Sequence, residues 1–188
     1  MIQDHGIDAL SMRKLADHVG VSRTAPYHHF KDKNELVCAV AESGFKLQDE
    51  YVNQKTANDH LATIDSGNQG LLELEHLVQS YIHFATTHPA HYDLMYGGSI
   101  WKQKLASQSL EAASRNSFRH WLSRIETLQA RGVLSQHETA LRTAQVAWAT
   151  LHGLCRLAND GVYIDKTNVI QMGNSAARMM LANPIKDD

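Results

Sequence analysis

The sequence predicts an all-α protein, on three observations. No segment of the 188 residues shows sustained alternation of apolar and polar residues, which is the period of a half-buried strand. Hairpin dipeptides flanked by strand-like runs are also missing. Apolar residues instead recur at helical spacing, between residues that are typical of helix ends. About eight helices and no sheet are expected.

Two short helices are predicted near the start of the chain. Ser11 is placed to cap a helix over residues 12–19, and Gly20 to end it in the left-handed conformation. That helix carries one apolar stripe, made of Met12, Leu15, Ala16 and Val19. A turn of about three residues, as in a helix-turn-helix corner, leads to a second helix over residues 23–30. Ser22 is placed to cap it.

Six more helices follow in the prediction. Asp32 and Glu35 form an Asp-x-x-Glu capping box that opens the first of them. TIDSGNQG, residues 63–70, has turn chemistry and is expected to mark a loop or the start of the larger domain. The remaining helices are expected in residues 71–87, 91–98, 110–131, 137–160 and 167–181. Pro89, Gly97 with Gly98, Gly132 and Gly161 separate them. Two domains are expected, 1–46 and 47–188.

Composition indicates a cytoplasmic globular protein. Hydrophobic residues make up 43% and charged residues 20% of the chain, so disorder is not indicated. No apolar run approaches the roughly 20 residues of a membrane span, and the start lacks the pattern of a signal peptide. Cys38 and Cys155 are expected to be reduced, buried thiols.

The stretch VSRTAPYHHF, residues 21–30, is unusually polar for a packing helix. In a two-helix corner the second helix offers its outer face to the DNA major groove. Val21 and Phe30 are expected to turn inward, while the polar side chains and Tyr27 face bases and phosphates. The residues predicted to contact DNA are Ser11, Arg13, Ser22, Arg23, Thr24, Pro26, Tyr27, His28, His29 and Lys33. A surface corner without a partner remains the alternative.

Charge supports the DNA interpretation only locally. The whole chain has a net charge of −2, so it is not a general polyanion binder. Residues 13–33 nevertheless hold five cationic side chains against two carboxylates: Arg13, Lys14, Arg23, Lys31 and Lys33 against Asp17 and Asp32. Lys33 falls in the first turn of its helix, where free N–H groups can hold a phosphate.

Residues 6–36, GIDALSMRKLADHVGVSRTAPYHHFKDKNEL, resemble the helix-turn-helix of the TetR/AcrR family of transcriptional repressors. The matching residues are Gly6, Ser11, Leu15, Ala16, Gly20, Val21, Ser22, Tyr27, His29, Phe30, Lys33 and Leu36. AWATLHGLCRLANDG, with Trp148, His152 and Gly153, resembles the C-terminal domain of a subgroup named for its Trp-His-Gly signature. FATTHPAHYDLMY also resembles a segment of that subgroup.

The resemblance implies a repressor that binds a palindromic operator in double-stranded DNA as a homodimer. The last two helices would form the dimer interface, and a small-molecule effector of unknown identity would bind the C-terminal domain. Small and flexible apolar residues suit that interface: Ala144, Ala147, Leu151, Cys155, Ala176, Met179 and Met180. Gly153 would let another helix come close.

Seven residues are candidates for an apolar effector pocket: Tyr92, Met95, Trp101, Phe118, Trp121, Trp148 and His152. Core packing is the favoured interpretation of Trp148 and His152. Relatives usually carry a further helix before Gly6, so the chain is expected to lack most of it, through a misplaced start, lost residues or a genuine truncation. A helical dimeric scaffold or effector-binding protein that has lost DNA binding is therefore the alternative function.

The sequence predicts neither an enzyme nor a metalloprotein. The motifs of serine hydrolases, P-loop and dinucleotide-binding enzymes and zinc proteases are absent. His83, His88 and His91 lie near one another in the sequence, but no cysteine or carboxylate completes a familiar zinc spacing. No cofactor is expected.

Overall fold

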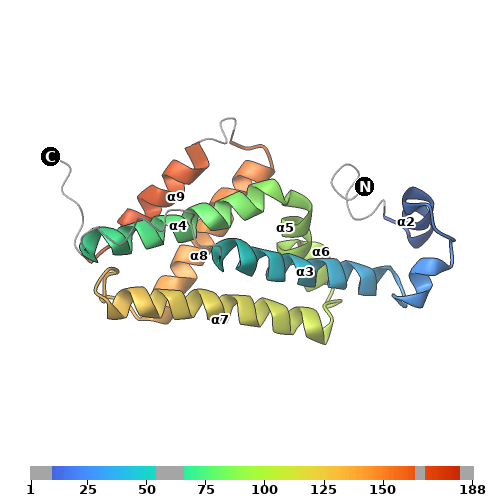
Figure 1. Ribbon diagram of the computed structural model, residues 1–188, viewed down its shortest axis with the longest axis horizontal. Helices are drawn as coiled ribbons and strands as arrows, with labels where there is room; N and C mark the ends of the chain where they lie inside the picture. The colour runs from blue at the N-terminus through green and yellow to red at the C-terminus, as the bar shows by residue number, and fades with distance from the viewer. Residues whose placement is uncertain (1–9, 54–65, 164–167, 183–188) are drawn as a thin grey trace. The chain divides into compact units, whose positions relative to one another are not determined.

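A computed structural model describes residues 10–53, 66–163 and 168–182 (Figure 1). These residues form eight α-helices, one 3₁₀ helix and no strand beyond an isolated bridge. The elements are α2 (Met12–Val19), η1 (Ala25–His28), α3 (Lys33–Asn53), α4 (Ser66–Thr87), α5 (Pro89–Tyr96), α6 (Gly98–Lys102), α7 (Gln108–Ala130), α8 (Ala140–Asn159) and α9 (Asn168–Arg178). The all-α prediction is confirmed.

Helix ends follow local signals in most places. Pro89 occupies the first turn of α5, and the predicted stop of α4 before it is correct. Gly132 and Gly161 have φ angles of 73° and 74°, in the left-handed region that glycine tolerates best. Thr139 caps α8 by accepting a hydrogen bond from the N–H of Arg142 at 3.2 Å, so that helix begins three residues later than predicted.

Tertiary contacts override three predictions. Residues 66–70 are helical, not a loop, and Gly70 lies so close to Val133 that a Cβ would collide with it. Gly97 ends α5 but also begins α6, a helix that was not predicted. The last helix ends at Arg178, since Leu181 forms a β-bridge with Leu134. Residues 63–65 of the predicted loop lie outside the described residues.

Two compact units make up the chain. The first comprises Met1–Leu47 and His88–Arg115, and the second comprises Gln48–Thr87 and Asn116–Asp188. Both α3 and α7 contribute residues to each unit. The domain boundary expected after residue 46 stays a prediction.

The core of the first unit lies where α3 meets α5. Gly44 of α3 faces the side chain of Met95, whose sulfur would lie 2.6 Å from a Cβ at that position. Phe45 and Tyr96 contact edge to face, with ring centroids 5.5 Å apart. Met95 is fully buried. A residue larger than glycine at position 44 would therefore displace the Met95 side chain.

In the second unit α4, α8 and α9 pack against one another (Figure 1). α9 presents a stripe of small buried residues, Val169, Gly173 and Ala177. Trp121 of α7 joins this core by donating its indole N–H to the carbonyl of Ala144 at 3.0 Å. Among the described residues, no helix is both long and apolar enough to cross a membrane.

Candidate nucleic-acid interface

The predicted corner begins with α2, whose ends are both set by local chemistry. The Ser11 hydroxyl accepts a hydrogen bond from the N–H of Lys14 at 3.2 Å. Gly20, at a φ of 73°, donates its N–H to the carbonyl of Ala16. Met12 and Ala16 are buried. The predicted cap, helix and left-handed stop are confirmed.

The second element of the corner is a 3₁₀ helix and not the α-helix predicted over residues 23–30. Its hydrogen bonds span three residues: Ala25 N–H to Ser22 O, Tyr27 N–H to Thr24 O and His29 N–H to Pro26 O, at 3.0–3.1 Å. Pro26 lies in the first turn, where its missing N–H is tolerated, and its carbonyl also accepts the N–H of Phe30 at 3.0 Å. Ser22 also accepts the Ala25 N–H through its hydroxyl at 3.2 Å.

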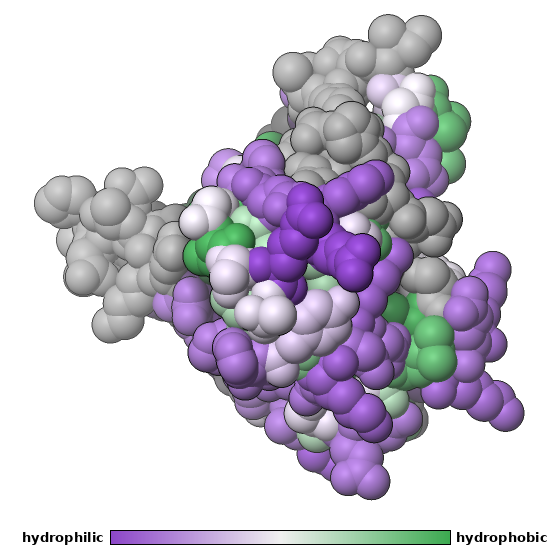
Figure 2. Space-filling view, turned by 90° about the vertical axis from the view of Figure 1, so that its right-hand side faces the viewer, coloured by the Kyte–Doolittle hydropathy of each residue, from purple (hydrophilic) through white to green (hydrophobic). Residues whose placement is uncertain are grey.

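The corner leaves most of its polar side chains in solvent. Of the residues predicted to contact DNA, Arg13, Ser22, Arg23, Thr24, Tyr27, His28 and His29 are exposed, and Ser11, Pro26 and Lys33 are half-buried. Tyr27 is 52% exposed, a large fraction for an aromatic residue on a short, hydrogen-bonded element. Figure 2, which faces the side where α2 lies, shows mainly hydrophilic surface with small hydrophobic areas.

Two inward-facing predictions are wrong. Val19 is 59% exposed, so it does not extend the buried stripe of Met12 and Ala16, and Val21 is 47% exposed. Both flank Gly20, the left-handed residue that ends α2. Phe30 is half-buried, as a residue that anchors η1 would be.

An ion pair that the sequence did not suggest connects the two elements. Arg23 binds Asp17 through Nε to Oδ1 at 3.1 Å and Nη2 to Oδ2 at 3.4 Å. The pair joins the last turn of α2 to the turn before η1 and is largely exposed, so it contributes little to stability. No periodicity rule relates residues on opposite sides of a turn, so no sequence signal would have found the pair.

α3 begins with a capping arrangement close to the one predicted. The Asp32 carboxylate accepts the N–H of Glu35 at 2.9 Å, and the Glu35 carboxylate accepts the N–H of Lys31 at 2.6 Å. The return bond therefore reaches one residue further than in the standard capping box. Because these two carboxylates are engaged by the backbone, the ammonium groups of Lys31 and Lys33 remain available to an anionic partner.

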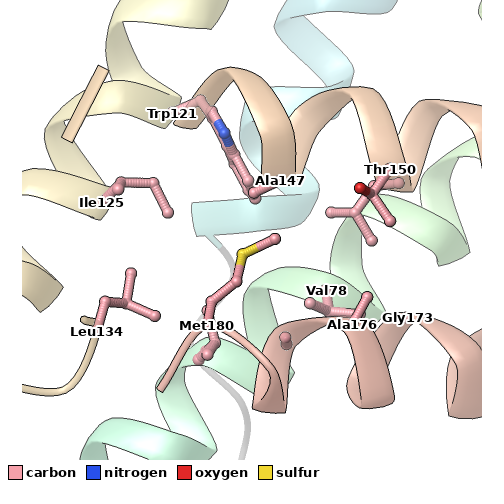
Figure 3. Close-up of a pocket in the computed structure, with 12 residues that line it drawn as sticks. Val78, Trp121, Ile125, Leu134, Ala147, Thr150, Gly173, Ala176 and Met180 are labelled. Atoms are coloured by element: carbon pink, nitrogen blue, oxygen red, sulfur yellow. The ribbon is translucent and has the colours of Figure 1, made fainter. Parts of the chain in front are cut away.

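The second unit contains an apolar cavity between α4, α7, α8 and α9 (Figure 3). About 20 Å³ of it is open to the centre of a water molecule, which is room for roughly one water. Its lining is apolar except for the Thr150 hydroxyl: Leu74, Val78, Trp121, Ile125, Leu134, Ala147, Thr150, Leu151, Gly173, Ala176, Ala177 and Met180. Figure 3 shows Met180 and Trp121 on opposite sides of this space.

Of the seven predicted pocket residues, only Trp121 lines this cavity. Tyr92 and Met95 are fully buried in the first unit, and the indole N–H of Trp101 donates to the carbonyl of Met95 there at 2.7 Å. Helical periodicity identified apolar faces, but which faces meet depends on the tertiary packing. Residues such as Ile125 and Leu134 were missed for that reason.

Phe118, Trp148 and His152 form an aromatic cluster in the second unit. Ring centroids lie 5.7 Å apart between Phe118 and Trp148, and 6.2 Å apart between Trp148 and His152. Burial, with a smaller effect of the Arg156 charge, lowers the pKa of His152. Nothing in the described chain lies within 4 Å of a Cβ at Gly153, so the prediction of a close helix there is not met within one subunit.

The histidines considered as metal ligands do not form a metal centre in the described residues. His88 and His91 contact edge to face at 5.9 Å, and no group of three or more suitable side chains occurs in the part of the chain that the structure describes. His83 stacks near Tyr51 at 5.5 Å. Burial, followed by the charge of His88, lowers the pKa of His91.

The geometry thus defines a helix-turn-helix corner on one unit and a helical unit with an apolar cavity. Residues 1–40 match the family described as "Bacterial regulatory proteins, tetR family". Residues 74–182, more than half of the chain, match "Tetracyclin repressor-like, C-terminal domain". The chain belongs to the TetR family. Membership of the Trp-His-Gly subgroup stays a prediction.

Curated relatives match over part of their length. Tetracycline repressor protein class A from transposon 1721 of Escherichia coli is 42% identical over 43 residues, which cover 23% of this chain and 20% of that protein. Tetracycline repressor protein class C of Escherichia coli is 32% identical over 59 residues, covering 31% and 27%. The matches therefore span about a fifth to a quarter of those relatives.

Solved structures match nearly the whole chain. A protein with unknown function from Rhodococcus sp. RHA1 has a TM-score of 0.75 and 28% identity, covering 97% of this chain and 90% of that one. The TetR family transcriptional regulator PfmR from Thermus thermophilus has a TM-score of 0.66 and 14% identity, covering 98% and 94%. The latter similarity establishes the fold alone.

Proposed function

We propose that the protein is a DNA-binding transcriptional repressor. It acts as a homodimer on a palindromic operator and is released by a small-molecule effector. The observation that carries this proposal is the exposed corner of α2 and η1, where Tyr27 and His28 face solvent from a hydrogen-bonded scaffold. A role on operator DNA implies a cytoplasmic location.

The chemistry of the corner suits duplex DNA. Imidazole and hydroxyl groups can read base edges in the major groove, and the exposed ring of Tyr27 offers an apolar edge to a thymine methyl. Arg13 and Lys31 are exposed beside it and can neutralise phosphates, which supply affinity and orientation without reading sequence. Substitutions of Tyr27 or His28 should therefore change sequence specificity, whereas substitutions of Arg13 or Lys31 should change affinity for any duplex.

Exposed apolar side chains on α8, on α9 and directly after α9 support a homodimer through these helices. They are Leu141, Val146, Leu157, Ile170 and Met179, the last 85% exposed. Val146, Gly153 and Leu157 share one face of α8, at positions i, i+7 and i+11. A second copy can approach that face closely at Gly153, where a Cβ would have no neighbour within 4 Å.

The interface predicted from sequence is wrong in part. Ala144, Ala147, Leu151 and Cys155 are buried within the subunit, so they are not available to a partner. On α8 these four residues point away from the side that carries Val146. They pack toward the core of their own chain. Met179, directly after the end of α9, remains available.

The cavity beside Trp121 is the proposed effector site. Effector pockets of drug size measure about 300–1,000 Å³, so an effector must open this space by moving Met180 or α9. An apolar molecule with at most one hydrogen-bonding group would match the lining, whose polar group is the Thr150 hydroxyl. A ligand changes the affinity for DNA only if it binds the opened state more tightly than the closed one. The size of the change is set by that ratio of ligand affinities.

Binding to a duplex from the gene's own upstream region tests the proposal. Fluorescence anisotropy should show that Tyr27→Ala and His28→Ala each weaken operator binding. A lost base contact costs about 1–3 kcal/mol, so a homodimer that loses two should bind about 30- to 20,000-fold more weakly. Binding to scrambled duplex should change much less. His137→Ala, at an exposed histidine of the second unit, is the matched control and should leave operator affinity unchanged.

Two outcomes would count against repression of an operator. A protein that binds no duplex of its upstream region would favour the helical scaffold instead. Equal loss of affinity in His28→Ala and His137→Ala would show that the corner does not read DNA.

A further inference from the structure

The loop that joins α6 to α7, residues 103–107, is tied to the first turns of α3. The carbonyl of Leu105 accepts a hydrogen bond from Nδ2 of Asn34 at 2.9 Å and another from the thiol of Cys38 at 3.4 Å. All of these residues belong to the first unit. Asn34 directly follows Lys33 in the chain. The loop is therefore held at the end of α3 that adjoins the corner of α2 and η1.

Lys104, immediately before Leu105, adopts a backbone conformation that lysine rarely takes. Its φ is 55°, and it is the single non-glycine residue with positive φ among the described residues. The N–H of Lys104 donates to Trp101 O at 3.2 Å and the N–H of Leu105 to Ile100 O at 2.9 Å. This is the Schellman motif that ends many helices, and glycine is the usual residue at the position of Lys104.

Folding alone does not account for a lysine at this position. The side chain is exposed, so it contributes little packing. The backbone would be more relaxed with glycine, which has no Cβ to clash in the left-handed region. A role for the charge explains the residue, since Lys104 lies in the loop that Asn34 holds at the start of α3.

The charges around this point indicate an anionic partner. Lys31 is exposed at the start of α3, and the carboxylates of Asp17, Asp32 and Glu35 each accept a hydrogen bond from the chain itself. Lys104 thus adds a positive charge to the loop that is bonded to the start of α3. Regularly spaced phosphates of duplex DNA would meet such a surface with release of counterions.

We propose that Lys104 contacts a phosphate of the operator backbone beside the groove that the corner of α2 and η1 enters. The DNA interface then includes a loop some seventy residues beyond the start of α3 in the sequence, held in place by the bond from Asn34 to Leu105. This inference rests on the proposed function. The Lys104 contact adds affinity for any duplex sequence and no base specificity.

The test is the salt dependence of DNA binding by Lys104→Gly in the full chain. Glycine is the residue that the left-handed position prefers, so the melting temperature should stay the same or rise. A plot of log affinity against log salt should be shallower by about 0.9 for each lost phosphate contact, hence by about 1.8 for a dimer. Operator and scrambled duplex should lose affinity alike. Lys104→Arg should keep most of the wild-type slope.

Lys102→Ala is the matched control, because it removes the same charge next to the same loop. The Lys102 side chain lies back along Gly98, where a Cβ would meet its Cδ and Cε at 3.0 Å. The slope of log affinity against log salt for Lys102→Ala should stay near that of the wild type. An unchanged slope in Lys104→Gly, or an equal reduction in Lys102→Ala, would overturn the proposed contact while leaving the repressor function intact. A wild-type chain that binds no duplex would overturn both.

Discussion

Gly173 allows α9 to lie directly against α4, and enlarging it tests how tightly the second unit is packed. A Cβ on Gly173 would lie 2.7 Å from Cγ1 of Val78 and 2.7 Å from Cδ1 of Ile82. Alanine in place of glycine inside a helix gains about 1 kcal/mol of helix propensity. Overpacking a core costs about 1–3 kcal/mol. Gly173→Ala should therefore lower the free energy of unfolding by about 0–2 kcal/mol.

A double-mutant cycle separates the collision from the helix propensity. Ile82→Val removes Cδ1, one of the two colliding atoms, and should by itself cost about 0.5–1.5 kcal/mol. In the double variant, the space left by that methyl group relieves part of the clash. The two changes should then be less destabilising together than their sum, by about 0.5–1 kcal/mol.

Urea denaturation followed by far-ultraviolet circular dichroism measures all four proteins of the cycle. Trp121, which lies in the same unit, provides a second probe by fluorescence. Two results would show that α9 does not approach α4 as described. One is that the two free-energy changes are strictly additive. The other is that Gly173→Ala is more stable than the wild type by the full helix propensity.

Three further predictions concern stability. Ser11→Ala removes the cap of α2 and should cost about 1 kcal/mol of unfolding free energy, measured by urea denaturation; an unchanged value would show that the Ser11 bond to the helix N-terminus is not formed. Nε2 of Gln129 donates to the carbonyls of Ser135 and Glu138 at 2.7 and 3.1 Å. Gln129→Leu removes this donor and should lower the free energy of unfolding by about 1–3 kcal/mol. Gln145→Leu, on the exposed side of α8, is the control and should be nearly neutral. Burial lowers the pKa of His152, so the unfolded chain binds more protons at this group than the folded chain does. The free energy of unfolding should therefore fall as pH drops below about 6.5, by at most about 1.4 kcal/mol per pH unit for this group. His152→Gln should flatten that dependence in urea titrations at pH 5.5–7.5, and an equally steep dependence in the variant would assign it to other groups.

The sequence by itself determined the helical class and most helix ends. The cap at Ser11 and the left-handed stop at Gly20 depend on bonds between residues no more than four apart. A reader of the sequence sees both partners at once, which is why these features were predicted correctly. The same holds for the exposed position of Tyr27, since a polar ten-residue stretch offers no apolar face to bury it.

Only the tertiary structure decided how the helical faces meet. It held Arg23 on Asp17 and lined the cavity with residues of α4, α7, α8 and α9. It also brought Leu105 to Asn34, 71 residues away in the sequence. Periodicity specifies which side of a helix is apolar, but the partner of that side depends on the packing of the whole unit, because apolar attraction is not directional.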